Sequence, residues 1–241
     1  MGLISCFQDL RLLFFLASGK LKSMKAKSSK GASTKQRIIE AAAKLMYLKG
    51  VNGTSVDDVL GASGTGKSQF YHYFSSKESL VKELISYHLA SLPTASEERL
   101  QGLGTLAGID KWLDQILENY HGGYYEAGCP IGNLASELSA QSEDLRIDLE
   151  STFAHWESCL TQGLRQLKGQ GVLQSSVNPE SLAMFCVAAI EGALLLSKTT
   201  KHAASIEATI SQLKAHIRAQ CMGASRRRPP AAAMSKLTFV P

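Results

Sequence analysis

Residues 55–81, SVDDVLGASGTGKSQFYHYFSSKESLV, fit two sequence signatures that cannot both describe the folded structure. Residues 61–68 fit the phosphate-binding pattern GxxxxGK[ST], in which backbone amides, Lys67 and Ser68 would hold a phosphate and Mg²⁺. The same stretch also fits two short helices joined by a tight turn. The choice between these two signatures constrains the fold class of the whole chain more than any other feature.

The phosphate-binding interpretation requires a buried strand of a parallel sheet immediately before the loop. The five residues before Gly61 instead place Asp57 and Asp58 in the middle of the supposed strand. The chain also lacks the repeated Val- and Ile-rich runs of a parallel sheet, and no later apolar run ends in an Asp that would hold Mg²⁺. A P-loop-type nucleotide-binding protein that uses residues 61–68 is therefore the alternative hypothesis, and a helical unit is the main one.

Helix signals account for the whole segment. Ser55 with Asp58 three residues later predicts a capping box at the start of one short helix, and Gly64 falls at the turn that follows it. Ser75 with Glu78 predicts a second capping box at the start of the next long helix. Between these two caps lies a second short helix, which we expect to begin near residue 65 or 66 and to end at residue 73.

Helical periodicity predicts which side chains of this region are buried. The second short helix should bury its aromatic residues Phe70, Tyr73 and Phe74 and expose its polar ones. Upstream, the run TKQRIIEAAAKLMYLKG predicts a helix from residue 34 that ends at Gly50. Its apolar stripe consists of Ile38, Ile39, Ala42, Leu45 and Met46. Three helices with one small shared core follow.

These three helices resemble the TetR (tetracycline-repressor-like) family of transcriptional regulators over residues 34 to about 85. The resemblance is carried by the LKG end of the first helix, by SVDDVL and above all by FYHYFSSKESL. In that family the outer face of the recognition helix and the start of the next helix contact a DNA operator. The residues to which the resemblance assigns DNA contacts are Ser55, Lys67, Ser68, Gln69, Tyr71, His72 and Lys77.

The distribution of charge agrees with a DNA-binding unit joined to a second unit that avoids DNA. Residues 20–77 hold eleven Lys or Arg against three Asp or Glu, whereas residues 78–222 hold ten against seventeen. The basic arm over residues 20–37 has two interpretations, a solvated disordered tail or a nucleic-acid contact. A basic membrane-surface protein that uses residues 1–37 is a third function class.

The remainder of the chain is predicted to be helical. We expect an all-α fold, with an N-terminal three-helix helix-turn-helix DNA-binding domain over residues 34–80 and a helical ligand-binding and dimerisation domain over residues 81–222. Residues 1–33 are predicted to be a disordered or mis-annotated basic extension, and residues 223–241 a disordered basic tail. Helices are predicted at 77–92, 109–126, 130–140, 143–168, 179–200 and 204–220, and Asn178 before Pro179 should cap the fifth of these.

The run SLAMFCVAAIEGALLLS, residues 181–197, is apolar nearly all round. Such a helix is buried on more than one face, either in the centre of a monomer or against a second subunit. The family resemblance implies the second arrangement, a homodimer. The residues assigned to that interface are Phe185, Ile190, Glu191 and Leu194.

The resemblance also implies an effector pocket in the second domain, and aromatic side chains are its candidate lining. The candidates are Trp112, Tyr120, Tyr124, Cys129, Phe153 and Trp156. Cys129 precedes Pro130 at the start of a predicted helix, whose N-terminus would lower the thiol pKa and make it reactive. A buried, inert thiol is the other interpretation of Cys129.

We therefore predict a dimeric, ligand-responsive regulator, most simply a repressor, which binds a palindromic operator and is released by a small-molecule or electrophile effector. The five cysteines show neither CxxC nor metal-ligand spacing, which predicts no metal and a cytoplasmic location with free thiols. No cofactor, no enzymatic activity and no membrane partner are expected.

Overall fold

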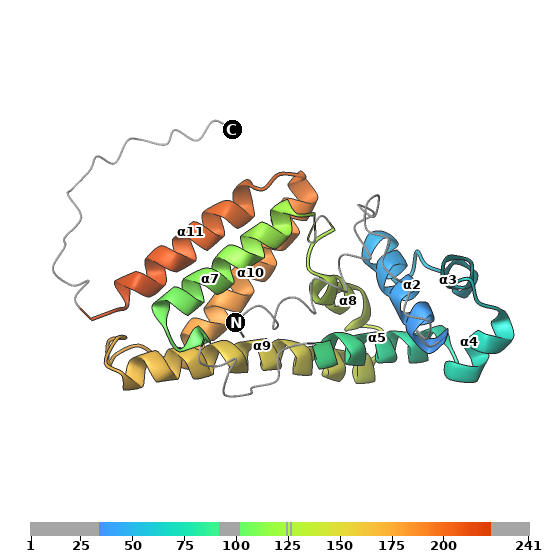
Figure 1. Cartoon of the computed structure of the whole chain (residues 1–241), viewed down its shortest axis with the longest axis horizontal. Coiled ribbons are helices and arrows are strands. Elements are labelled where there is room, and N and C mark those ends of the chain that lie inside the picture. The colour runs from blue at the N-terminus through green and yellow to red at the C-terminus, as the bar shows by residue number, and fades with distance from the viewer. Residues whose placement is uncertain (1–33, 92–101, 124, 126, 223–241) are drawn as a thin grey trace, which may run out of the picture.

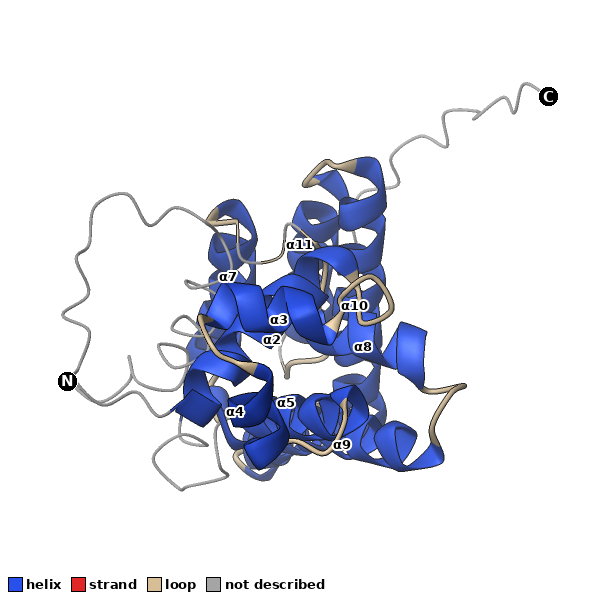
Figure 2. Ribbon diagram, turned by 90° about the vertical axis from the view of Figure 1, so that its right-hand side faces the viewer, coloured by secondary structure: helices blue, strands red, loops and turns tan. Residues whose placement is uncertain are grey.

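The computed structural model describes residues 34–91, 102–123, 125 and 127–222. Within these residues regular structure is helical, apart from one isolated antiparallel bridge between Leu173 and Cys221 (Figure 2). The predicted all-α fold class is confirmed. The helices are α2 (Thr34–Lys49), α3 (Val56–Ser63), α4 (Lys67–Tyr73), α5 (Lys77–Ser91), α7 (Leu106–His121), α8 (Pro130–Leu138), α9 (Glu143–Gly169), α10 (Pro179–Thr200) and α11 (Ala204–Ala219).

Helices α2, α3 and α4 form the N-terminal unit, residues 34–74, at one end of an elongated molecule (Figure 1). Its core is made by Ile38 and Ala42 of α2 with Phe70 of α4, each completely buried. Removing these apolar surfaces from water is the main stabilising contribution to a unit of this size. Leu45, predicted to lie on the same stripe, is only partly buried and packs against the edge of this core.

Helix caps locate several helix starts. The Ser55 hydroxyl accepts a hydrogen bond from the Asp58 amide at 3.1 Å, and the Asp58 carboxylate accepts one from the Ser55 amide at 2.8 Å. The amide of Ser181 donates to Asn178 Oδ1 at 2.8 Å, so the predicted cap of α10 is confirmed. These contacts satisfy amides that have no partner within the helix.

The second predicted capping box was wrong by one residue. The Ser79 amide donates to Ser76 Oγ at 3.1 Å, and the Ser76 amide donates to Ser79 Oγ at 3.1 Å. Helix α5 therefore begins at Lys77, with Ser76 as its cap. The alternative Ser75–Glu78 pairing is one residue out of step, and the Glu78 carboxylate instead accepts a hydrogen bond from the Ser142 hydroxyl.

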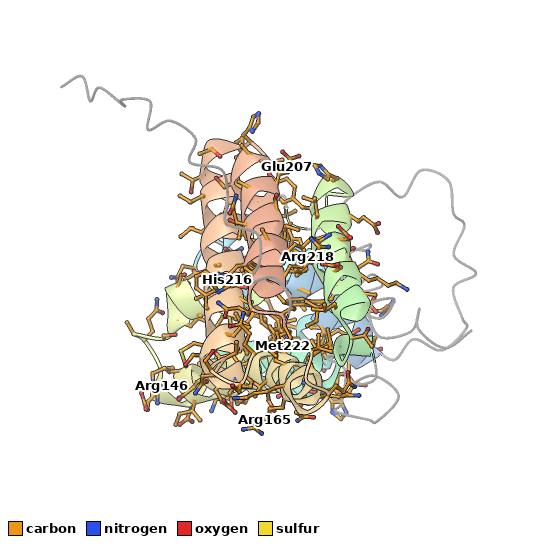
Figure 3. The ribbon with its side chains drawn as sticks, turned by 90° about the vertical axis from the view of Figure 1, so that its left-hand side faces the viewer. Arg146, Arg165, Glu207, His216, Arg218 and Met222 are labelled. Carbon is orange, nitrogen blue, oxygen red and sulfur yellow. The ribbon has the colours of Figure 1, made fainter. Side chains whose placement is uncertain are left out.

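Four helices, α7, α9, α10 and α11, make up most of the body, residues 102–222 (Figure 1). Polar side chains join α7 to α11 along their length: Asp110 forms an ion pair with Arg218 at 2.5 Å, and His121 Nε2 lies 3.3 Å from Glu207 Oε1. Figure 3 shows Glu207 and Arg218 well apart along α11. Helix α7 starts three residues earlier than predicted because Thr105 caps it, and it ends at His121 before two glycines.

Helix α10 is long and apolar enough to cross a membrane by length and composition alone. It packs between α9 and α11, and nine of its residues, from Pro179 to Ser197, are buried inside the chain. It is therefore the central core helix of the body, as expected for a helix whose side chains are apolar on nearly all sides.

One face of α10 remains exposed. Met184, Phe185, Leu195 and Leu196 lie on that face, each at least half exposed, and a side chain at Gly192 would meet open space. Two of the residues assigned to a subunit interface lie elsewhere, because Ile190 is 7% exposed and Leu194 is 2% exposed within the chain's own core. Only Phe185 of the four predicted interface residues stands on the exposed apolar face.

Candidate nucleic-acid interface

The N-terminal unit presents a short exposed helix, α4, on a tight turn after α3. Gly64 ends α3 in the left-handed conformation, with φ of 64°, where glycine is favoured because it has no Cβ. Its amide donates to Leu60 O, and the hydroxyls of Ser63 and Thr65 lie 2.7 Å apart across the turn. The turn leads directly into α4 at Lys67.

This geometry excludes the phosphate-binding loop as a structural element. Residues 61–63 belong to α3, residues 64–66 form the turn, and Lys67 and Ser68 open α4. A helix, not a buried strand, precedes the motif. The match to GxxxxGK[ST] arises because glycines are placed at a helix end and at a helix start.

Two phenylalanines anchor α4 to the core beneath it. Phe70 is fully buried and Phe74 is 2% exposed, with ring centroids 5.4 Å apart. Tyr73, predicted to be buried with them, is 41% exposed and lies beside His72 with ring centroids 4.7 Å apart. A seven-residue helix has room for two aromatic side chains in this small core, and the third is left at the surface.

The remaining side chains of α4 form its outer surface. Tyr71 is 57% exposed, and its ring packs edge-on against Phe70 with centroids 5.2 Å apart. The exposed side chains on α4 are Lys67, Ser68, Gln69, Tyr71, His72 and Tyr73, whereas Ser55 is exposed at the cap of α3 and Lys77 is half-buried at the start of α5. Five of the seven sequence-predicted DNA contacts thus lie on α4, and the other two lie at the starts of α3 and α5. Tyr73, which helical periodicity had assigned to the core, belongs to the exposed surface of α4.

On α4 itself, Lys67 and Gln69 have polar partners within the protein. Lys67 Nζ lies 3.3 Å from Asp57 Oδ1, and both side chains are about seven-tenths exposed. An exposed pair of this kind contributes at most about 1 kcal/mol, so a phosphate can replace the carboxylate at little cost. Gln69 Oε1 accepts a hydrogen bond from the Gly66 amide at 3.1 Å, which caps α4, and its Nε2 group takes no part in that bond.

The aromatic residues predicted to line an effector pocket are partly buried in the body. Trp112, Tyr120, Phe153 and Trp156 all pack against the core, and the rings of Phe153 and Trp156 meet edge to face with centroids 5.5 Å apart. Phe153 also lines an open groove of about 410 Å³ between α8 and α9. Tyr124 lies outside the described residues.

Cys129 is the N-cap residue of α8, where its sulfur accepts a hydrogen bond from the Gly132 amide at 3.4 Å. Burial raises the pKa of the Cys129 thiol well above its ordinary value, and the neighbouring Glu191 carboxyl acts in the same direction. Burial likewise raises the pKa of Glu191. Of the two interpretations of Cys129, the burial of its side chain favours the inert thiol, because desolvation outweighs the helix end at this site.

Both parts of the chain match known protein families. Residues 38–84 match the family described as bacterial regulatory proteins, tetR family. Residues 105–212 match the family described as transcriptional regulator LmrA/YxaF-like, C-terminal domain.

Individual relatives agree with these families. The HTH-type transcriptional regulator in the lacX 3′ region of Lactococcus lactis subsp. lactis is 35% identical over 187 residues, which cover 76% of this chain and 92% of the relative. The HTH-type transcriptional repressor DhaR of a Mycobacterium species is 25% identical, over 70% of this chain and 84% of the relative. The crystal structure of the regulatory protein TetR from Rhodobacter sphaeroides superimposes with a TM-score of 0.66 at 25% identity, covering 76% of this chain and 98% of that one.

Proposed function

Because this chain belongs to the TetR family of transcriptional regulators, a non-enzymatic family, we propose that it acts in the cytoplasm as a homodimeric repressor of a palindromic operator, released by a small-molecule effector. The family binds DNA operators, and its members typically form homodimers. The observation that carries the proposal is the outer surface of α4, where polar and aromatic side chains surround a helix held by Phe70 and Phe74.

The exposed side chains of α4 suit the edges of bases in a major groove. Gln69 and Ser68 carry both donors and acceptors, and Lys67 carries donors that match guanine. Tyr71, Tyr73 and His72 lie further along α4, where phosphates or thymine methyl groups would be within their reach. Lys77 and Ser55 would contact the backbone and fix the register without reading sequence.

A single helix of seven residues makes few base contacts, so a second copy is needed for a specific site. The exposed apolar face of α10 is where we place the subunit contact, with Phe185, Leu195 and Leu196 as its centre. Leaving this face in water would be unfavourable, and a two-fold partner would cover it with the same face. Operator palindromy then follows from the symmetry of the dimer.

We propose that the effector binds among the aromatic residues Trp112, Tyr120, Phe153 and Trp156, which are partly buried against the core of the body. Such rings provide stacking area for a small apolar or aromatic molecule. Cys129 contributes a protonated thiol rather than a thiolate, so a molecule bound by contact is favoured over an electrophile that reacts with it.

Protection mapping of the DNA that flanks the gene tests the core of this proposal. We expect a protected palindrome whose two halves are separated by about one helical turn, and binding by a dimer. The Gln69→Ala, Tyr71→Ala double variant should lose the protected pattern and still fold. Uniform binding to unrelated DNA at low salt, with no protected site, would contradict the proposal.

A further inference from the structure

Helix α8 is the part of the body that lies next to α2 of the N-terminal unit (Figure 1). It is nine residues long, which corresponds to about 13 Å at the usual rise of a helix. Its Ile131, Leu134 and Leu138 are buried, so the helix is held as one rigid piece. Hydrogen bonds attach its two ends to different parts of the molecule.

The C-terminal end of α8 is attached to the N-terminal unit through Glu137. Its Oε2 accepts a hydrogen bond from the Val51 amide at 2.8 Å, and its Oε1 accepts one from the Asn52 amide at 2.5 Å. These two amides follow Gly50, which ends α2 with φ of +78°. Successive amides after a left-handed residue form a concave site for an anion, and the carboxylate fills this one.

The fit of Glu137 against the turn is close. A Cβ at Gly50 would lie 3.0 Å from Glu137 Oε2 and 3.3 Å from Oε1. The turn itself is held by bonds that do not involve Glu137, since the Gly50 amide donates to Met46 O at 2.9 Å and the Thr54 amide to Val51 O at 3.2 Å. The Glu137 carboxylate therefore links the turn after α2 to α8 without being needed to hold the turn itself.

The N-terminal end of α8 is attached to the body and to α2. Asn133 donates from Nδ2 to Ala127 O at 2.7 Å and accepts a hydrogen bond from Lys198 Nζ of α10 at 2.9 Å. The Ala127 amide in turn donates to the Tyr47 hydroxyl of α2 at 2.9 Å. A change in the body that moves Asn133 or Lys198 would therefore move α8.

We propose that Glu137 is a positioning residue for operator binding, through which the position of α8 in the body sets the orientation of the N-terminal unit. The proposal rests on the proposed function. A rigid helix with one end on α10 and the other in the turn after α2 transmits displacement of either end to the other. Coupling between two sites is reciprocal, so operator binding must also alter the N-terminal end of α8.

Amide hydrogen exchange on the full chain, with and without the protected DNA as probe, tests this inference. In the free protein, Glu137→Gln should increase exchange at Val51 and Asn52 by roughly tenfold or more, because the carboxamide replaces one of the two accepting oxygens with an NH2 group that cannot accept a hydrogen bond. Gly50 and Thr54 in the same turn should exchange as before. Glu118→Gln changes an exposed acid on α7 and is the matched control. It should leave amide exchange unchanged at all four of these residues.

The coupling itself is read at the other end of α8. In the wild type and in Glu118→Gln, operator DNA should change exchange over residues 127–133, whereas in Glu137→Gln this change should disappear. Glu137→Asp keeps the charge but is one methylene shorter, so it should show a reduced change. Circular dichroism and thermal unfolding of each variant separate this outcome from simple loss of the fold.

Two results would overturn the inference. If Glu137→Gln binds operator and residues 127–133 respond as in the wild type, Glu137 is not a positioning residue, and the proposed function stands. If the wild type binds no specific DNA, the proposed function fails and this inference fails with it. The two failures are distinguishable because only the second appears in the wild-type protein.

Discussion

The outer face of α4 and the outer face of α10 are both exposed, but their chemistry is opposite. On α4 the exposed residues are polar or carry a polar group, as Gln69 and Tyr71 do. On α10 the exposed residues include Met184, Phe185, Leu195 and Leu196. A polar face is stable in water and available to a hydrated partner such as DNA, whereas a contiguous apolar face requires a protein partner. One molecule thus carries two surfaces that differ in what must cover them.

The two faces also differ in what supports them. Helix α4 has seven residues and relies on two buried phenylalanines, so its position depends on a small core. Helix α10 has 22 residues and is packed between two other helices of the body. Substitutions beneath α4 should therefore affect folding, and substitutions on the outer face of α10 should affect association.

The largest effect is expected from Phe70→Ala, which empties the core beneath α4. We expect the free energy of unfolding to fall by about 3 to 5 kcal/mol and operator binding to be lost with it. Tyr71→Ala is the matched control on the same helix, and it should weaken DNA binding while changing stability by less than about 0.5 kcal/mol. Urea unfolding followed by circular dichroism measures the stability of both variants. If Phe70→Ala were as stable as Tyr71→Ala, Phe70 would not be an anchor of α4.

Leu195→Ser is expected to weaken the dimer without unfolding the subunit. The free energy of dimerisation should weaken by about 1.5 to 3 kcal/mol for each substituted subunit, because the apolar Leu195 side chain no longer packs against the partner subunit. Ile147→Ser is the control, because Ile147 is an equally exposed apolar residue on α9, outside the α10 face. Sedimentation equilibrium should show a raised dissociation constant for the first variant alone. An unchanged dimer in both would place the contact elsewhere.

Gln69→Ala should reduce operator affinity by about 1 to 3 kcal/mol and relax base preference at one position in each half-site. It also removes the side-chain cap of α4, so a thermal melt is needed beside the binding measurement. Affinity is measured on the operator and on operators changed at single positions. If the variant keeps the full base preference, Gln69 reads no base.

The smallest effect is expected from Lys77→Ala, which would remove one of the proposed phosphate contacts. Affinity should fall about equally for every DNA sequence, and the slope of log affinity against log salt should become shallower by about one unit. Lys111→Ala, an exposed lysine on α7, should leave the slope unchanged. Titrations at several salt concentrations measure this slope, and identical slopes for both variants would exclude Lys77 from the interface.

Apart from the Ser75–Glu78 capping box, which is local and was still wrong by one residue, the outcome of the sequence predictions follows from how local each feature is. The capping box of Ser55 and Asp58 and the cap at Asn178 were predictable because each involves residues three apart in the chain. The exposure of Tyr73 was not, because it depends on how much space the neighbouring helices leave for its ring. Glu137 gave no sequence signal, since its partners Val51 and Asn52 lie more than eighty residues away.

By itself, the sequence determined the class of fold, the helix-turn-helix and most helix ends, because periodicity, glycines and caps act within a few residues. The tertiary structure alone decided which face of α10 is exposed and that Ile190 and Leu194 lie inside. A helix that is apolar on all sides has no periodicity to orient it, so its inward face is set by the helices that pack against it, here α9 and α11.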